Sequence, residues 1–281
     1  MIPSLPPSTG PIGVFDSGYG GLTILDKIRG LMPEYDYIYL GDSARCPYGP
    51  RSFEVVYEFT LQAVSKLFEL GCPLVILACN TASAKALRTI QQINLPVIDA
   101  TRRVLGVIRP TAECIGEITR SRHVGILATA GTIKSESYLL EIHKLSPDIV
   151  VTGEACPMWV SLVENNEYQS EGADYFVKQH INRLLDKDPM IDTIILGCTH
   201  YPLLLDKIRQ FTPGHIRIIA QGEYVARSLQ DYLNRHPEMD ARCEKGGKCR
   251  FLTTESENKF EESASIFLGR QEKSRKHSIG I

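Results

Sequence analysis

The sequence predicts an α/β protein made of two pseudo-symmetric domains with mostly parallel sheets and a functional site in the cleft between them. Three observations predict this class. Short β-branched runs recur along the chain, helical patterns separate these runs, and the first half of the chain is echoed in the second. Strands that alternate with helices form mostly parallel sheets. At 281 residues, the chain is long enough for two domains that each have a core.

Eight short apolar runs are expected to be strands. They are nearly continuous in apolar residues, which is typical of strands in a sheet that helices cover on both faces. The runs occupy residues 12–15, 37–40, 74–77, 97–98, 124–127, 149–151, 193–196 and 216–219.

Helical patterns lie between these runs, because apolar residues recur there at spacings of three and four. After residue 245 the pattern changes, and we expect one last strand at 248–253, one last helix at 261–269 and a frayed polar end at 273–281. The helical sets include Leu22, Leu25, Ile28 and Met32, and Phe59, Ala63, Leu67 and Leu70, with Gly71 as a helix stop.

Four motifs of the first half recur in the same order in the second half. A period above 110 residues indicates duplicated domains, whereas solenoid repeats are about 20–50 residues long. We therefore expect one domain from residues 1–100 plus 215–281, a second from 101–214, and a hinge near 99–102 and 212–216. The matched motifs are Gly13-Val-Phe-Asp-Ser-Gly18 with Gly125-Ile-Leu-Ala-Thr-Ala-Gly131 (125 − 13 = 112), Tyr39-Leu-Gly-Asp42 with Val151-Thr-Gly-Glu154, Val75-Ile-Leu-Ala-Cys79 with Ile194-Ile-Leu-Gly-Cys198, and Val97-Ile98 with Ile218-Ile219.

The charge balance argues against nucleic acid or a membrane surface as a partner. The chain has 31 basic and 33 acidic residues, a net charge of −2, and no apolar run of the roughly 20 residues that span a bilayer. The segment 1–11 is rich in Pro and Ser and lacks the basic start and the apolar stretch of a secretory signal. We expect a cytoplasmic protein.

Eight cysteines are expected to be free thiols in a reducing cytoplasm. None has the Cys-x-x-Cys spacing of a zinc or redox motif, so no metal is expected. Cys243 and Cys249 flank a Lys-Gly-Gly-Lys turn that resembles a metal knuckle, but no second ligand pair follows.

Cys79 and Cys198 are the cysteines that sequence position singles out. Each ends a predicted buried strand in matching places of the repeat, where ligands bind in parallel α/β sheets. Each also lies where a helix begins, and free backbone N–H groups there favour a thiolate. Racemisation at a carbon needs one acid/base group on each face. Two thiols that face each other across a pseudo-two-fold axis provide that arrangement.

The turn Asp16-Ser17-Gly18-Tyr19-Gly20-Gly21 is the first of several turns expected around these thiols. It fits neither the Gly-x-Gly-x-x-Gly nor the P-loop pattern, so nucleotide binding is not favoured, but its N–H groups and the Ser17 hydroxyl could hold a carboxylate. Asp16 would lie near Cys79, unless it is only a helix N-cap. The other turn residues expected to contribute are Tyr48 and Gly49, Glu154 and His200 beside Cys198, and Thr129 and Thr132, each of which could instead be an ordinary structural residue.

These residues together resemble the glutamate racemases of the aspartate/glutamate racemase superfamily, over nearly the whole chain from Ile12 to about Leu252. The resemblance implies conversion of L-glutamate to D-glutamate for peptidoglycan without pyridoxal phosphate or metal, and commonly a homodimer. The motifs that carry it are Gly13-Val-Phe-Asp-Ser-Gly-Tyr-Gly-Gly-Leu22, Pro47-Tyr-Gly49, Ala78-Cys-Asn-Thr-Ala82 and Leu196-Gly-Cys-Thr-His-Tyr-Pro202.

The resemblance also implies roles for single residues. Cys79 serves the proton of the D-isomer with help from Asp16, and Cys198 serves that of the L-isomer with help from Glu154 and His200. Ala220-Gln221 departs from the Asp that the family more often has after this strand, which puts local packing in doubt. The residues implied to line the substrate are Asp16, Ser17, Tyr48, Gly49, Asn80, Thr81, Thr199 and His200.

Three alternatives remain open from the sequence. The chain could racemise another acidic amino acid such as aspartate. It could be a non-catalytic two-domain protein that closes on an anion, although such a protein would not need both cysteines. A flavodoxin-like or nucleotide-binding enzyme is the third, and the missing phosphate motif argues against it. If the domains close on a substrate, we expect the lone tryptophan, Trp159, to report the closure.

Overall fold

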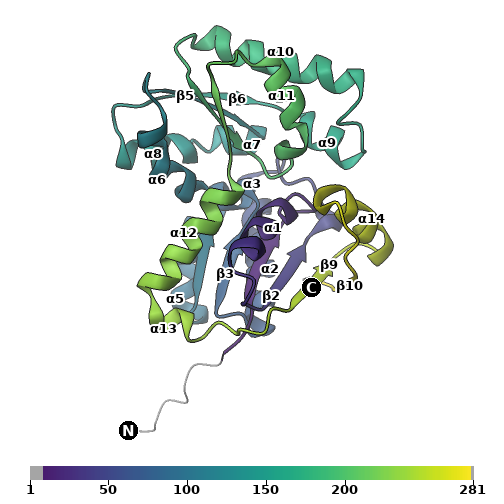
Figure 1. Ribbon diagram of the computed structural model, residues 1–281. Coiled ribbons are helices and arrows are strands. Elements are labelled where there is room, and N and C mark those ends of the chain that lie inside the picture. The colour runs from purple at the N-terminus through teal and green to yellow at the C-terminus, as the bar shows by residue number, and fades with distance from the viewer. Residues whose placement is uncertain (1–8, 280–281) are drawn as a thin grey trace, which may run out of the picture.

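The computed structural model describes residues 9–279 and has two lobes, each built on its own sheet of parallel strands (Figure 1). The first eight residues of the Pro- and Ser-rich segment and the last two residues of the chain lie outside this range. The expected α/β class is confirmed, because helices alternate with strands throughout.

The lower lobe in Figure 1 contains a six-stranded sheet of order β10-β9-β2-β1-β3-β4. All neighbouring strands in it are parallel. Every residue of β1, β2 and β3 is buried, as their continuous apolar sequences predict. The strands are β1 (Ile12–Asp16), β2 (Tyr37–Gly41), β3 (Leu74–Leu77), β4 (Arg103–Gly106), β9 (Cys249–Thr253) and β10 (Ser274–Lys276).

The upper lobe contains a four-stranded parallel sheet of order β6-β5-β7-β8. This order repeats that of β2-β1-β3-β4, so the internal repeat of the sequence corresponds to two sheets with the same local topology. The strands are β5 (His123–Ala128), β6 (Val150–Ala155), β7 (Thr193–Gly197) and β8 (Arg217–Ala220).

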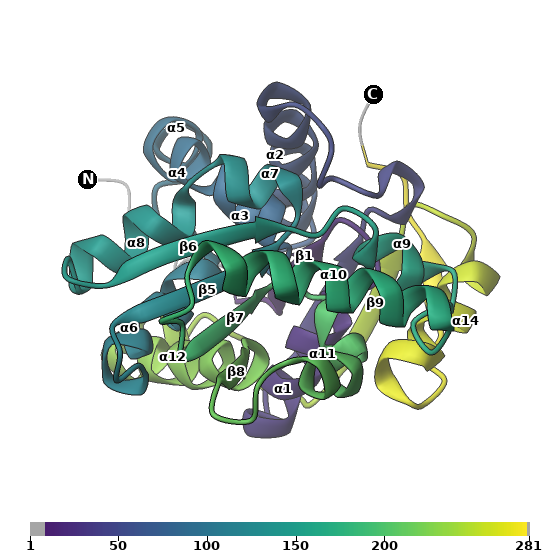
Figure 2. The same cartoon turned by 90° about the horizontal axis from the view of Figure 1, so that it is seen from above.

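Helices cover both faces of each sheet (Figures 1 and 2), and an apolar core lies on each covered face. The helices of the lower lobe are α1 (Leu22–Leu31), α2 (Phe53–Glu69), α3 (Asn80–Lys85), α4 (Leu87–Thr89), α5 (Leu95–Ile98), α12 (Gly222–Arg235), α13 (Pro237–Asp240) and α14 (Glu257–Leu268), with the short turns η1 (Ser43–Arg45) and η2 (Ile90–Asn94). Those of the upper lobe are α6 (Ile108–Ile118), α7 (Ala130–Lys134), α8 (Ser137–Leu145), α9 (Trp159–Glu164), α10 (Glu171–Lys187), η3 (Tyr201–Leu204) and α11 (Leu205–Phe211).

One expected strand is wrong. Val97 and Ile98 end helix α5 instead, and both side chains are exposed. Pro96 occupies the first turn of that helix, where a missing N–H is tolerated and the fixed φ favours helix. The strand that takes this place in the first sheet is β4, which begins at Arg103, a few residues after Ile98. The true counterpart of β8 is therefore β4.

The chain crosses between the two sheets after Gly106 and again after Ala220, because β4 belongs to the first sheet and β8 to the second. Both crossings lie a few residues beyond the boundaries at 100 and 214 that the sequence suggests.

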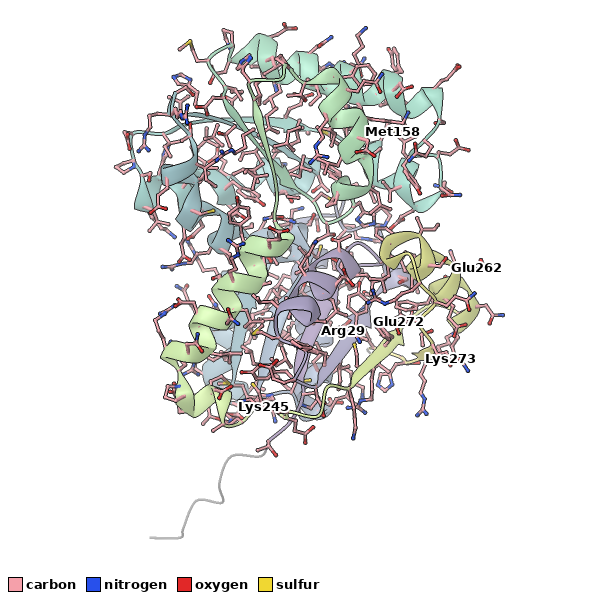
Figure 3. The ribbon with its side chains drawn as sticks, in the orientation of Figure 1. Arg29, Met158, Lys245, Glu262, Glu272 and Lys273 are labelled. Atoms are coloured by element: carbon pink, nitrogen blue, oxygen red, sulfur yellow. The ribbon has the colours of Figure 1, made fainter. Side chains whose placement is uncertain are left out.

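The C-terminal part returns to the first sheet, and the strand and helix expected there are present as β9 and α14. Residues 274–276 are not frayed, because they pair with β9 as strand β10. An ion pair between Arg29 and Glu272 (3.3 Å) fastens this segment to α1 (Figure 3). In residues 9–279, every helix is too short or too polar to cross a membrane.

Candidate active site

A narrow cavity lies between the lobes, where the loops after β1, β3, β5 and β7 meet. Its volume of about 20 Å³ holds roughly one water molecule, so the two lobes are closed on each other. The residues that line it are Ser17, Cys46, Pro47, Tyr48, Gly49, Cys79, Asn80, Thr81, Thr129, Val160, Cys198, Thr199 and His200.

Cys79 lies two residues after the end of β3 and is the N-cap of α3. Its Sγ accepts the backbone N–H of Ala82 (3.5 Å) and lies 3.3 Å from Oγ of Ser17. Burial, and next the nearby charge of Asp16, raise the pKa of this thiol to about 12 despite the two hydrogen bonds. Cys79 therefore rests as a neutral thiol that can donate a proton.

Asp16 ends β1 and is fully buried. Its Oδ2 accepts the backbone N–H of Gly18 (2.9 Å), and Oγ1 of Thr199 lies 3.5 Å from Oδ1. Burial raises the pKa of the carboxyl group, although the charge of His200 and backbone N–H donors oppose this. The charge of Asp16 acts on Cys79, as expected, but through space and outside the lining of the cavity.

Cys198 follows β7 directly, but it caps no helix, because the short turn η3 begins at Tyr201 with His200 as its N-cap. The expectation that a helix begins at each cysteine therefore holds only for Cys79. Sγ of Cys198 lies 3.9 Å from Nδ1 of His200, and Nε2 of His200 lies 3.0 Å from Oε1 of Glu164. Burial lowers the pKa of the imidazole, but the hydrogen bonds and charges of Cys198 and Glu164 outweigh burial and raise it to about 10. At neutral pH the imidazole is therefore a buried cation beside Sγ of Cys198.

Glu164, and not Glu154, is the carboxylate partner of His200. Glu154 lies at the end of β6, where it binds Nδ1 of His180 (2.7 Å) and Nζ of Lys187 (2.5 Å), so the expectation that it assists Cys198 is wrong. Strand β6 points the Glu154 side chain at α10, whereas Glu164 ends the short helix α9 and lies behind His200. The sequence marks Glu164 only as a polar residue after an apolar run.

Threonines join the two lobes on the opposite side of the cavity. Oγ1 of Thr81, from the lower lobe, lies 2.9 Å from Oγ1 of Thr129 and 3.3 Å from Oγ1 of Thr132, both from the upper lobe. Thr129 lines the cavity and Thr132 lies behind it. Backbone N–H of Gly131 donates to the carbonyl of Gly49 (3.0 Å) and continues this contact.

Asn80 and Tyr48 are held by buried partners. Nδ2 of Asn80 donates to Gln221 (2.8 Å), and its Oδ1 accepts the hydroxyl of Tyr138 (2.7 Å). Gln221, the residue that departs from the family pattern, thus fixes the amide of a cavity residue. The Tyr48 hydroxyl donates to Asp42, which leaves its ring against the cavity.

Ten of the residues expected in the site line the cavity, whereas Asp16 and Thr132 lie just behind it and Glu154 lies elsewhere. Sequence reasoning missed Cys46, Pro47 and Val160 in the lining, and Glu164 behind His200. The available signal was the Cys46-Pro47 pair, which recurs in the second half of the sequence as Cys156-Pro157. Trp159 is fully buried against Tyr201 inside the upper lobe.

Within residues 9–279, no three side chains of His, Cys, Asp or Glu are grouped so that they could hold a metal ion. This includes the turn between Cys243 and Cys249.

The sequence profile of the Asp/Glu/hydantoin racemase family matches residues 23–229 of the chain. A glutamate racemase from Ruegeria sp. is 38% identical over an alignment of 270 residues that covers 92% of this chain and 97% of that protein.

Solved structures show the same similarity. A glutamate racemase isoform from Bacillus anthracis has a TM-score of 0.87 and 35% identity, covering 96% of this chain and 97% of its own. The glutamate racemase of Francisella tularensis, solved in complex with D-glutamate, has a TM-score of 0.85 and 31% identity over 98% of both chains.

Proposed function

The chain belongs to the Asp/Glu/hydantoin racemase family and is an amino-acid racemase, and from this premise we propose that it interconverts L- and D-glutamate with Cys79 and Cys198 as the two acid/base groups. One observation carries the proposal. The two cysteines come just after matching strands of the two lobes, β3 and β7, and line one cavity. The Francisella relative, which binds D-glutamate, supports the choice of substrate.

The proposed reaction moves one proton at each face of Cα. For L-glutamate, the thiolate of Cys198 takes the Cα proton, and the thiol of Cys79 donates a proton to the opposite face. D-glutamate reacts by the reverse path. The high pKa of Cys79 suits a donor, and the cation of His200, held by Glu164, faces Sγ of Cys198. Each turnover leaves the two protonation states exchanged, so the enzyme serves both directions.

Polar groups of both lobes would hold the substrate. Ser17, Asn80 and Thr199 offer side-chain partners, and Thr81 with Thr129 offers hydroxyls from both lobes at once. Asn80, Thr81 and Thr129 lie at the starts of α3 and α7, where backbone N–H groups favour carboxylates. Substrate carboxylates bridging the lobes would favour the closed form.

We propose that the reaction needs neither pyridoxal phosphate nor metal, because two thiols suffice for proton transfer at both faces. The enzyme would supply D-glutamate for peptidoglycan in the cytoplasm. Its eight free thiols suit a reducing compartment.

We also propose that the chain forms a homodimer through an exposed apolar surface of the lower lobe. Ile93, Val97 and Ile98 expose apolar side chains on the α4–α5 segment, and Val97 is 85% exposed. Sedimentation of the wild-type chain should give a dimer, and Val97→Asp should weaken it. Met190→Asp, on the other lobe, is the matched control, since Met190 is also exposed. A monomeric wild type at micromolar concentration would refute the dimer.

The direct experiment follows the circular dichroism of L-glutamate incubated with purified protein after dialysis against a chelator and a carbonyl reagent. We expect the signal to decay to zero, and D-glutamate to give the mirror-image curve. Aspartate is measured in parallel. Faster loss of the aspartate signal would overturn the choice of glutamate, and loss of activity that pyridoxal phosphate restores would overturn the thiol mechanism.

A further inference from the structure

Cys46 is a third thiol at the cavity, and the proposed reaction does not use it. It follows η1 in the lower lobe and lines the cavity beside Pro47. Its Sγ lies 3.1 Å from Oε1 of Glu164, which is on α9 of the upper lobe. The contact is therefore a hydrogen bond between the two lobes.

Oε1 of Glu164 accepts two hydrogen bonds, one from each lobe. The second donor is Nε2 of His200 at 3.0 Å, whose other ring nitrogen faces Sγ of Cys198. Burial, and next the charge of Glu164, raise the pKa of Cys46 well above the usual value for a thiol, so Cys46 keeps the proton that it donates. A continuous path thus runs from Cys46 through Glu164 and His200 to Cys198.

The packing around this pair leaves little freedom. A Cβ at Gly18 would lie 3.0 Å from Sγ of Cys46 and 3.3 Å from Oε1 of Glu164, so the turn after β1 lies directly against both atoms. The ring of Phe267, from α14, covers the imidazole of His200 edge-on with 5.4 Å between centroids. The side chains of the path therefore have one arrangement when the lobes are closed.

We propose that Cys46 is a positioning residue, whose thiol seats the Glu164 carboxylate against His200 when the lobes close and so readies the Cys198 half of the site. The inference rests on the proposed racemase function. When the lobes part, Cys46 and Glu164 separate, because they belong to different lobes. The hydrogen bond thus links closure to one face of the reaction, because the side-chain partner of Cys79, the Ser17 hydroxyl, belongs to the same lobe as Cys79.

Because the path reaches only Cys198, its loss should slow proton transfer at one face of Cα. A general loss of structure would not have this effect. In a two-base racemase, a variant that hinders the Cys198 step must lower kcat/KM equally in both directions, because the equilibrium constant between mirror images is one. The primary deuterium isotope effects on kcat/KM for the two isomers must then differ from each other. With Cα-deuterated L-glutamate, the slowed step breaks the labelled bond, so the effect rises. With deuterated D-glutamate, the labelled bond breaks before the slowed step, so the effect falls toward one.

We expect Cys46→Ala to lower kcat/KM about three- to tenfold, the loss of one hydrogen bond to a charged group, and to separate the two isotope effects in this sense. Cys46→Ser keeps a hydrogen-bond donor. It should restore kcat/KM to within about twofold of wild type and return the two isotope effects to their wild-type values. Cys114→Ala, which removes a half-buried thiol on α6 far from the cavity, is the control and should behave as wild type.

Equal isotope effects for both isomers in Cys46→Ala, with or without a lower rate, would overturn the proposal. Failure of the wild type to racemise glutamate would instead overturn the proposed function. Should Cys46→Ala not fold, the S–H stretching band of Cys46, identified in the wild type by its absence from Cys46→Ser, decides the matter. A shift to lower frequency when glutamate closes the lobes supports the hydrogen bond, and an unchanged band contradicts it.

Discussion

At the scale of single residues, the assignment of one cysteine to each isomer is tested by isotope exchange. In Cys198→Ala, Cys79 still faces the Cα hydrogen of D-glutamate, so it can remove that proton, exchange with deuterated solvent and return a deuteron to the same face. D-glutamate should gain deuterium without inversion, while L-glutamate stays unlabelled. Cys79→Ala should label only L-glutamate. Mass spectrometry with chiral separation measures both.

The pH must be varied in this experiment, because the charge of Cys198 contributes to the raised pKa of Cys79, so that removing Cys198 changes the surviving thiol. Labelling of both isomers by either variant, or near-native racemisation, would contradict the two-cysteine assignment.

Glu164 and Glu154 are chemically identical, and the structure gives them different tasks. Glu164→Gln removes the anion that holds the proton on His200, so the pKa of His200, now about 10, should fall toward the usual 6.5, and kcat/KM should fall at least about tenfold. NMR titration of the imidazole and steady-state kinetics measure the two effects.

Glu154→Gln is the matched comparison. It breaks a buried pair with His180, so it should lower the free energy of unfolding by about 1–3 kcal/mol and leave the activity of the folded enzyme near native. A large loss of activity in Glu154→Gln with none in Glu164→Gln would reverse the assignment.

The pH dependence of stability follows from the same histidine. A raised pKa in the folded state means that His200 contributes stability in full below its unfolded pKa of about 6.5 and that this stability is lost as the pH rises toward 10. Denaturant unfolding from pH 6 to 10 should therefore show a smaller loss for Glu164→Gln than for wild type. Parallel curves for the two proteins would show that Glu164 does not hold the proton.

These residues also show how far the sequence predicts the site. Cys79 and Cys198 could be predicted because chain duplication places them at matching strand ends, a feature of sequence order. Glu164 could not, because its role depends on the direction in which a six-residue helix points a side chain toward His200. The resemblance implies that role for Glu154, yet Glu154 pairs with Lys187 inside its own lobe, as Asp42, its match in the repeat, pairs with Arg45 in the other.

At the scale of elements, the turn between β1 and α1 controls how closely the lobes approach. A Cβ at Gly20 would lie 2.3 Å from both Nδ1 of His200 and Oγ1 of Thr199, which belong to the other lobe. Gly20→Ala should therefore keep the lobes apart and lower kcat/KM by about a hundredfold, because misplacement of about 1 Å has that effect. Steady-state kinetics measure it.

Gly30→Ala is the control for this variant, since no atom lies within 4 Å of its Cβ position and it occupies helix α1. It should keep full activity and raise the free energy of unfolding by about 0.5–1 kcal/mol. Near-native activity of Gly20→Ala would mean that the lobes need not approach this closely.

The strands, like the site residues, could be predicted where the sequence pattern alone determines the structure. Buried parallel strands such as β1, β3 and β7 are recognisable as continuous apolar runs. Strand β4 begins with an exposed Arg103 and carries only two large apolar residues, so the sequence favoured the apolar pair that ends α5. The exposure of that pair suggests that its apolar character serves contacts other than the core of one chain.

At the scale of the whole molecule, the closed cavity implies that the lobes must part in each catalytic cycle. Glutamate is far larger than the single water that about 20 Å³ admits, so neither entry nor release is possible in this form. The chain passes between the lobes twice, after Gly106 and after Ala220. In a hinge motion, the lobes would rotate about these two segments. Closure would also exclude water, which could otherwise protonate a carbanion from either face.

Small-angle X-ray scattering tests this motion at a protein concentration that fixes the oligomeric state. Without ligand, we expect a larger radius of gyration than the closed structure gives, and saturating D-glutamate should reduce it to the closed value. Gly20→Ala should stay expanded with ligand, since its methyl group meets His200 and Thr199 before the lobes are closed. Tryptophan emission is the weaker probe, because Trp159 is packed against Tyr201 within one lobe and its surroundings move with it. Identical scattering of the wild type with and without saturating glutamate would show that the cleft does not open and close, and access to Cys79 and Cys198 would then require a local movement of the cavity loops.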